Sequence, residues 1–221
     1  MYEKSQKSQH LALFDFDGTL CKIDSFTGFI FFALPKWQIF IRGFFILPWI
    51  IAYYLKLYPA HQMRPKLFKQ MFKGQNLASI DLAASAYAQQ LIQKHLNPQL
   101  FQQLCQHKKL DHHVILVSAS IDLYLEYICK ILNIDLICSQ VEYTEHYLTG
   151  CYLTPDCSNE QKCLRILYKF NPLKNRTIYA YGNSQEDNAM LSLTKYSYMV
   201  GKDEKMPSLN EKHADYPNTK L

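Results

Sequence analysis

Residues 11–20 read LALFDFDGTL, and this stretch decides how the rest of the chain is interpreted. Residues 11–16 are short and apolar, as a buried strand would be, and they run directly into Asp17 and Gly18, which favour a turn. Similar strands are predicted at 114–117 (VILV), 134–138 (IDLIC) and 177–181 (TIYAY), with helical patterns between or after them. Strands that alternate with helices predict an α/β fold in which a parallel sheet is covered on both faces.

Residues 25–95 break this alternation, because they contain long helical stretches and no convincing strand. They predict an all-helical cap inserted into a core that is formed by 1–24 and 96–221. A chain of 221 residues is long enough for one such core with a sizeable insertion. A hairpin attached to the core sheet is expected within 141–153, and the tail from Lys202 onward is expected to be loosely attached.

The composition excludes several classes of protein. Hydrophobic residues make up 48% of the chain and charged residues 19%, which is typical of a packed core and not of disorder. The net charge of +5 favours an anionic substrate or membrane surface, but no concentrated basic block indicates nucleic-acid binding. The seven cysteines contain no Cys-x-x-Cys pair, which indicates free thiols in a reducing cytoplasm. The polar N-terminus precedes the first strand, the wrong order for a cleaved secretory signal, so a cytoplasmic location is expected.

Polar residues follow the predicted strands at the positions where a parallel sheet binds its ligands, the carboxyl ends. Asp15 and Asp17 end the first strand, and Ser118 ends the second. The segment 182–187 (GNSQED) follows the last predicted strand, and Lys162 belongs to the helical stretch before that strand. The sequence therefore predicts a single site to which all these residues contribute.

At these residues the sequence resembles the haloacid dehalogenase superfamily of phosphohydrolases. Residues 15–20 (DFDGTL) match the first motif, the apolar strand closed by Ser118 the second, Lys162 the third and 182–187 the fourth, in the right order. Four ordered motifs are far more specific than any one of them. The resemblance covers roughly residues 11–200 and implies a Rossmann-like parallel sheet with a C1-type helical cap, as in the phosphoserine-phosphatase-like subfamily IB.

The resemblance implies a Mg²⁺-dependent phosphatase that hydrolyses a phosphate monoester through an aspartyl-phosphate intermediate. Asp15 is then the nucleophile, and Asp17 protonates the leaving group and later deprotonates water. Ser118 and Lys162 would hold the phosphoryl oxygens, and Gly18 would let the chain turn sharply past them. The implied magnesium ligands are oxygen atoms of Asp15, Asp17 (through its backbone carbonyl), Asn183 and Asp187.

Asn183 departs from the family pattern, which more often has aspartate at this position. Asparagine is a neutral ligand and contributes less charge to the ion, so a catalytically weak phosphate-binding protein stays open as an alternative. Each residue alone also has a purely structural interpretation, such as a turn, a helix cap or a solvated side chain. Asp24, for example, is expected to cap a helix that begins at Ser25. Together and in this order, the residues favour catalysis.

The predicted cap has an unusual composition between residues 25 and 58, where no acidic residue occurs and only three basic residues interrupt an aromatic and aliphatic run. Its longest uncharged piece, 43–55, has 13 residues, short of the ~20 that a helix needs to cross a membrane. Pro48 is expected to kink a longer helix. Two interpretations are open: the aromatic side chains fill the interior of the cap, or the helices form a hairpin that dips into the cytoplasmic leaflet.

The substrate depends on this choice, because the cap of this branch covers the active site. A membrane-facing cap suits a phospholipid phosphate, and the chain resembles the phosphatidylglycerophosphatase C group in its hydrophobic cap and fourth motif. A closed soluble cap suits phosphoserine, histidinol phosphate or a sugar phosphate. The expected partner is thus a phosphorylated small molecule or lipid, together with peripheral contact to the inner face of the cytoplasmic membrane in the first case. Three basic side chains are candidates for a second anionic group of the substrate: Arg64, Lys66 and Lys69. For each of them taken singly, a solvated side chain is the favoured interpretation.

Overall fold

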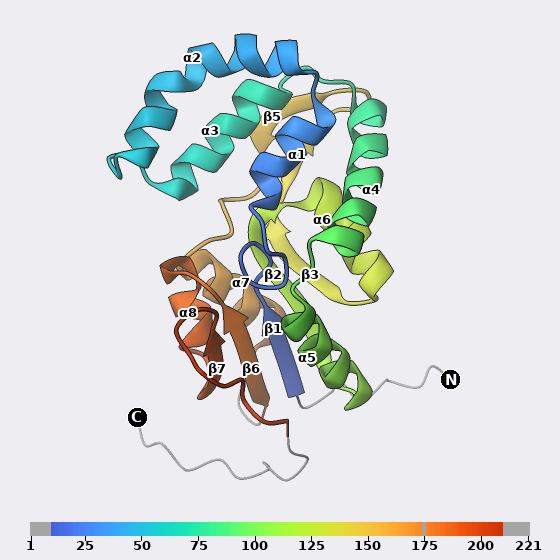
Figure 1. Ribbon diagram of the computed structural model, residues 1–221, viewed down its shortest axis with the longest axis vertical. Helices are drawn as coiled ribbons and strands as arrows, with labels where there is room; N and C mark the ends of the chain where they lie inside the picture. The colour runs from blue at the N-terminus through green and yellow to red at the C-terminus, as the bar shows by residue number, and fades with distance from the viewer. Residues whose placement is uncertain (1–9, 174–175, 210–221) are drawn as a thin grey trace.

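The computed structural model describes residues 10–173 and 176–209, and a five-stranded parallel sheet forms the base of the molecule (Figure 1). The strands are β1 (His10–Phe14), β2 (His113–Ile121), β3 (Asp135–Ser139), β6 (Thr177–Gly182) and β7 (Tyr196–Met199). Their order is β3-β2-β1-β6-β7, so β1 lies in the middle and its carboxyl end adjoins those of β2 and β6. The predicted Rossmann-like α/β fold is confirmed, and β7 is a fifth strand that the sequence did not reveal.

Four helices cover the two faces of this sheet: α5 (Pro98–Lys109), α6 (Asp122–Leu132), α7 (Glu160–Phe170) and α8 (Asn188–Leu191). Alternate side chains of a strand point to opposite faces, and β1 contributes to two separate apolar clusters for this reason. Leu11 and Leu13 belong to the cluster that contains buried residues of α7 and α8. Ala12 and Phe14 belong to the cluster that contains buried residues of α5 and α6. The sheet is therefore buried on both sides, which fixes the position of its carboxyl edge.

Four more helices occupy the segment between β1 and α5: α1 (Ser25–Ala33), α2 (Lys36–Tyr54), α3 (Ala60–Phe72) and α4 (Leu77–Lys94). They lie above the carboxyl edge of the sheet, and we refer to them as the cap (Figure 1). Asp24 precedes α1 and caps its N-terminus, since its Oδ1 accepts a hydrogen bond from the backbone N–H of Thr27 at 3.0 Å. The predicted helix-capping role of Asp24 is confirmed.

α2 continues through Pro48 and curves over the top of the cap (Figure 1). The Arg42 side chain attaches it to α3, because Nη1 donates to the carbonyl oxygens of Met71 at 2.7 Å and Lys73 at 3.2 Å. These carbonyls lie at the end of α3, where a helix has no further N–H groups to satisfy them. Ile46 is the buried side chain of α2.

The predicted hairpin belongs to the cap and not to the core sheet, which corrects the sequence-based expectation. β4 (Val141–Tyr143) and β5 (Leu148–Tyr152) form a two-stranded sheet of their own. The turn between α3 and α4 binds this hairpin, since the N–H of Gly74 donates to the carbonyl of Leu148 at 2.9 Å and that of Leu77 to His146 at 2.8 Å. From here on, the cap comprises the helices α1 to α4 together with this hairpin, two segments that are widely separated in the sequence.

The first residues after β7 pack on the core. Gln103 Nε2 donates to the carbonyl oxygen of Pro207 at 3.2 Å, and Met206 and Leu209 lie against the apolar cluster under α5. The predicted loose attachment is therefore wrong for residues 206–209, while residues 202–205 are exposed. The rest of that tail, and the polar N-terminal residues 1–9, lie outside the described residues.

Candidate active site

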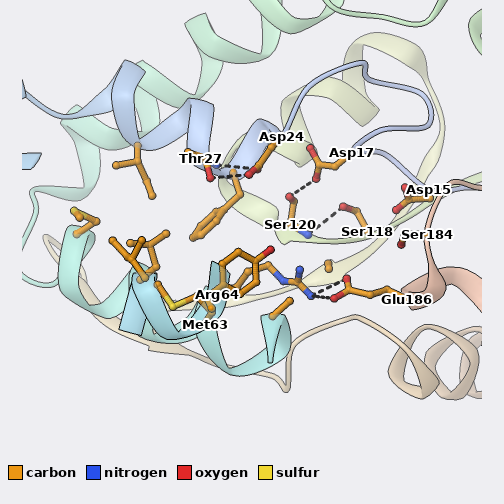
Figure 2. A pocket seen from close by; sticks show the side chains of 18 of the residues that line it. Asp15, Asp17, Asp24, Thr27, Met63, Arg64, Ser118, Ser120, Ser184 and Glu186 are labelled. Carbon is orange, nitrogen blue, oxygen red and sulfur yellow. Dashed lines mark hydrogen bonds and ion pairs between the residues drawn. The ribbon is translucent and has the colours of Figure 1, made fainter. Parts of the chain in front are cut away.

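The carboxyl ends of β1, β2 and β6 meet under the cap at a cavity of about 480 Å³. Six of the seven predicted site residues line it: Asp15, Asp17, Ser118, Lys162, Asn183 and Asp187. Figure 2 shows Asp15, Asp17 and Ser118 at one end of the cavity, with Met63 of the cap toward the other. The fold thus brings together side chains that are up to 172 positions apart in the sequence.

Lys162 joins two carboxylates at the sheet edge of the cavity. We refer to this edge, with Asp15, Asp17, Ser118, Lys162, Asn183 and Asp187, as the floor of the cavity. Its Nζ donates to Oδ1 of Asp15 and to Oδ1 of Asp187, each at 2.6 Å. Lys162 is 2% exposed because α7 holds it against the sheet. Burial alone would lower the pKa of this amine, but the two carboxylates outweigh burial and raise the pKa above its usual value. The lysine is therefore a fixed positive charge beside Asp15.

Asp15 is held at both oxygens, since Thr19 Oγ1 donates to its Oδ2 at 2.9 Å while Oδ1 accepts from Lys162. Burial, together with the neighbouring carboxylates Asp187 and Asp17, raises the pKa of Asp15 to about 7, even though Lys162 lowers it. One ammonium group does not compensate three buried carboxyl groups. The site consequently favours binding of additional positive charge.

Asp17 has two hydrogen-bond donors that sequence analysis missed. The backbone N–H of Ser25 donates to Oδ1 at 2.6 Å. Ser120 Oγ donates to Oδ2 at 2.5 Å (Figure 2). Burial raises the pKa of Asp17, although these hydrogen bonds lower it. Ser118 Oγ in turn accepts from the N–H of Ser120 at 3.0 Å. The sequence could have predicted that Ser120 belongs to the site, because residues two apart on a strand share a face and Ser118 was already assigned to the site.

Asp187 is oriented by the turn that precedes it. Its Oδ2 accepts from the backbone N–H groups of Asn183 and Ser184, each at 3.0 Å. Burial raises the pKa of Asp187, but Lys162 and these hydrogen bonds outweigh burial, and the pKa is lowered. Asp187 is therefore ionised at neutral pH.

Two glycines allow the loops after β1 and β6 to approach each other. Gly18 has φ +76°, and a Cβ there would lie 1.9 Å from Nδ2 of Asn183. At Gly182 a Cβ would lie 2.6 Å from the Cβ of Asp187. Any larger residue at either position would push apart the side chains on the cavity floor. Gly18 contributes backbone shape in this way and does not itself line the cavity.

The atoms at this edge of the sheet fit a hard divalent cation. Asp15 and Asp187 offer carboxylate oxygens and Asn183 an amide oxygen, which are the ligand types that Mg²⁺ prefers. The excess of carboxylates over ammonium groups gives the floor the negative charge that such an ion would neutralise. Within the described part of the chain, no three His, Cys, Asp or Glu side chains form a metal-binding group by themselves. The predicted ligand set differs from such a group, since it combines two carboxylates with an amide and a backbone carbonyl.

Arg64 of α3 reaches from the cap to the core. Its Nε donates to Oδ2 of Asp156 at 2.8 Å, and its Nη2 donates to Oδ1 of Asp156 at 3.0 Å. Nη2 also donates to Oε2 of Glu186 at 3.0 Å (Figure 2). Two carboxylates therefore already bind the guanidinium, which corrects its expected role toward a second substrate anion. Lys66 likewise has a partner, since its Nζ lies 4.3 Å from the ring centre of Trp49. The sequence held no signal for the Arg64 contacts, because the partners are 92 and 122 residues away.

Comparisons with known proteins agree with this geometry. The family model for haloacid dehalogenase-like hydrolases matches residues 12–192. Protein CicA of Caulobacter vibrioides is 27% identical over 190 residues, which are 83% of this chain and 82% of CicA. A protein of unknown function from Bordetella pertussis Tohama I has a similar structure, with a TM-score of 0.69 and 19% identity over 86% of this chain and 89% of that one. A phosphoserine phosphatase, solved as an analogue of its phospho-aspartyl intermediate, gives a TM-score of 0.61 and 17% identity over 86% of each chain.

Proposed function

The chain belongs to the haloacid dehalogenase-like hydrolase family, and we propose that it is a magnesium-dependent phosphatase that hydrolyses phosphate monoesters through an aspartyl-phosphate at Asp15. One observation carries this proposal: Asp15, Lys162 and Asp187 form a buried, hydrogen-bonded cluster that lines the cavity under the cap. A similarly folded phosphoserine phosphatase is described as a phospho-aspartyl intermediate analogue, which supports the same chemistry here. CicA adds sequence similarity over most of both chains.

The side chains of the floor divide the reaction between them. Asp15 attacks phosphorus in line, a P–O bond to Asp15 forms, and the P–O bond to the leaving group breaks. Asp17, whose pKa is raised by burial, gives its proton to the leaving alkoxide and then takes a proton from the water that cleaves the aspartyl-phosphate. Lys162 and Ser118 would hold phosphoryl oxygens.

Magnesium, held by oxygens of Asp15, Asp17, Asn183 and Asp187, would supply the positive charge that lets an anionic phosphate approach anionic carboxylates. The charge excess on the floor supports this assignment. Asn183 keeps the catalytically weak phosphate-binding protein as the alternative, because it adds no charge to the site.

Release of phosphate from para-nitrophenyl phosphate tests the proposal. Wild-type protein with MgCl₂ is expected to turn over, and EDTA is expected to stop it. Asp15→Asn should lower kcat by at least about 10³-fold at an unchanged melting temperature, since the nucleophile is lost while its shape is kept. Asp135→Asn, near the opposite end of the sheet on β3, is the matched control. Retention of a tenth of the wild-type activity by Asp15→Asn would exclude it as the nucleophile, and an inactive wild-type protein that still binds phosphate would favour the alternative.

For the substrate, a phospholipid phosphate such as phosphatidylglycerophosphate is our leading proposal, in line with the resemblance to the phosphatidylglycerophosphatase C group of subfamily IB. The apolar side chains that the cap contributes to the cavity support it. Phosphoserine, histidinol phosphate and sugar phosphates form the alternative class. A substrate panel with one member of each class separates them by kcat/KM.

We also propose that α2 rests on the anionic cytoplasmic face of a membrane. Aromatic side chains fill the cap only in part. In α1, Phe26 and Phe29 are buried but Phe31 is 64% exposed, and in α2, Phe40 is 78% and Phe44 69% exposed. Among the described helices, α2 is the one with the length and apolar composition to cross a membrane. Because Arg42 fastens the middle of α2 to α3, the helix is better placed to lie in the interface than to span it. Residues 25–80 contain seven basic residues and no acidic one, which suits an anionic surface.

Sedimentation with lipid vesicles tests this contact. The full chain should bind vesicles that contain phosphatidylglycerol and bind less to pure phosphatidylcholine vesicles, because the basic residues lose their partners there. Phe40→Ser combined with Phe44→Ser should weaken binding about tenfold or more, since two exposed aromatic side chains are lost. Tyr168→Ser removes a 94% exposed aromatic side chain from α7 and serves as control. Wild-type protein that stays in the supernatant with both kinds of vesicle would refute membrane contact.

A further inference from the structure

We propose that the cavity takes an uncharged apolar chain of the substrate directly beside its phosphate, and that Gly43 of α2 sets the room for this chain. The inference rests on the proposed phosphatase function and narrows its substrate class. The preferred substrate is a phosphate monoester whose leaving group continues as a long alkyl, isoprenoid or diacylglycerol body.

The upper part of the cavity is a corridor between α1, α2 and α3. Its walls are mostly apolar, and the side chains that form them include Ile30, Ile39, Ile50, Met63, Leu67 and Met71. The residues that α2 contributes at 39, 43, 50 and 53 follow helical spacing, so one face of this helix lines the corridor. The corridor is continuous with the part of the cavity that contains Asp15. One substrate molecule can therefore place its phosphate at Asp15 and its apolar chain between the helices.

The charges along the corridor favour an uncharged chain. Among the described residues that line the cavity, Lys162 and Arg64 are the only basic side chains. Lys162 is bound by Asp15 and Asp187, and Arg64 is bound by Asp156 and Glu186. A second anionic group next to the phosphate, such as the carboxylate of phosphoserine, would be desolvated without an unpaired cation to meet it.

Gly43 has no steric reason within the protein to be glycine. Glycine inside a helix costs roughly 1 kcal/mol relative to alanine. At Gly28 the packing explains this choice, because a Cβ there would lie 2.2 Å from the hydroxyl oxygen of Tyr87. A Cβ at Gly43 would meet only the Cε of Met71, at an ordinary contact distance of 3.9 Å. The space beside Gly43 is left open by the protein, and it lies in the wall of the corridor.

The test is a series of alkyl monophosphates, ethyl, butyl and octyl, kept below their micellar concentrations, with the full chain and MgCl₂. Burial of a methylene group is worth about a fourfold gain in kcat/KM, so octyl phosphate should exceed ethyl phosphate by at least about 100-fold. In Gly43→Leu, the octyl-to-ethyl ratio of kcat/KM should fall at least about tenfold, with Gly43→Ala in between. Ala52→Leu, which enlarges a small residue of α2 outside the cavity lining, should keep the wild-type ratio.

Each result either supports or overturns the inference. Equal kcat/KM for ethyl and octyl phosphate, an unchanged ratio in Gly43→Leu, or O-phosphoserine as a better substrate than octyl phosphate would overturn it. Should Gly43→Leu not fold, the wild-type series and Gly43→Ala decide. Absence of any phosphate release, from para-nitrophenyl phosphate included, would instead refute the proposed phosphatase function. With farnesyl phosphate and phosphatidic acid in mixed micelles, the ratio of the two kcat/KM values identifies the source of the chain.

Discussion

The two ends of the cavity are built in opposite ways. At the sheet edge, each carboxyl group is held by directional contacts: Asp15 by Lys162 and Thr19, Asp17 by Ser25 and Ser120. At the cap end, the walls are aliphatic and aromatic, and α2 has Ile46 as its buried side chain. Group transfer requires fixed positions, which hydrogen bonds on strand ends provide. Selection of an apolar body requires only volume and shape, for which non-directional contacts suffice.

Arg64 connects the two ends. It is a cap residue by position, yet its guanidinium binds Asp156 and Glu186 of the core. Glu186 belongs to the same short segment as Asn183 and Asp187, so the cap is tied directly to the loop that shapes the floor. Substitutions on the floor of the cavity, at the Arg64 contact and under the sheet should therefore have different effects on catalysis and on the free energy of unfolding.

The largest effect is expected at the floor. Lys162→Met should lower kcat by about 10³-fold or more and destabilise the fold by about 3–5 kcal/mol, because two buried carboxylates lose their shared cation. MgCl₂ should raise the melting temperature of this variant more than that of wild-type protein, since the ion replaces part of the lost charge. Lys169→Met on the same helix, which breaks a half-exposed pair with Asp135, should change stability by less than about 1 kcal/mol. If urea titration gave the same change in the free energy of unfolding for the two substitutions, the buried Lys162 contacts would stabilise the protein no more than an exposed ion pair does.

A smaller effect is expected at the tie between cap and core. Arg64→Met should destabilise the protein by about 2–3 kcal/mol, because Asp156 is 8% exposed and loses its charged partner. The comparison with Asp156→Asn and with the double variant measures the pair directly. A coupling energy of at least about 1 kcal/mol is expected from urea denaturation. If the two substitutions were additive, the contact would contribute nothing to closing the cap on the core.

Under the sheet, polar contacts stabilise the fold without touching the cavity, so no effect on catalysis is expected there and the effect on stability appears only in acid. His107 Nε2 lies 2.8 Å from the hydroxyl oxygen of Tyr181, and Nδ1 lies 2.7 Å from Nδ1 of His112. Burial, together with His112, lowers the pKa of His107 to about 3. Below pH 6.5 the unfolded chain therefore binds a proton that the folded chain does not, and the free energy of unfolding falls as the pH decreases toward the folded-state pKa.

The slope for this one histidine approaches about 1.4 kcal/mol per pH unit between pH 6 and 4, and the contribution is fully present above pH 6.5. Thermal unfolding of wild-type protein and His107→Gln across this window measures it. The glutamine variant should lose stability less steeply with acid, while His146→Gln, at an exposed position on the hairpin turn, should follow wild-type protein. Parallel slopes for all three proteins would contradict the assignment to His107.

Much of the floor was predictable from the sequence. Asp15, Asp17 and Ser118 follow apolar runs that are recognisable as strands, and a parallel sheet necessarily brings its carboxyl ends to one edge. Lys162 and Asp187 needed the order of four motifs in addition, since neither residue alone distinguishes a site from a solvated helix or turn. The fold class and the residues that form the floor could therefore be predicted from short segments of sequence, namely from the residue types at the ends of the predicted strands and helices.

The rest depended on contacts between distant segments. Ser120 as a partner of Asp17, Arg64 as a partner of Asp156, and the hairpin as part of the cap each join residues that are separated by dozens of positions. Exposure of α2 was equally undecided, because an apolar run reads the same whether it is buried or faces a lipid surface. The sequence by itself determined which groups can do chemistry at the sheet edge. Only the tertiary structure decided which charges are already paired, and hence where the cavity is polar, where it is apolar and where it is open.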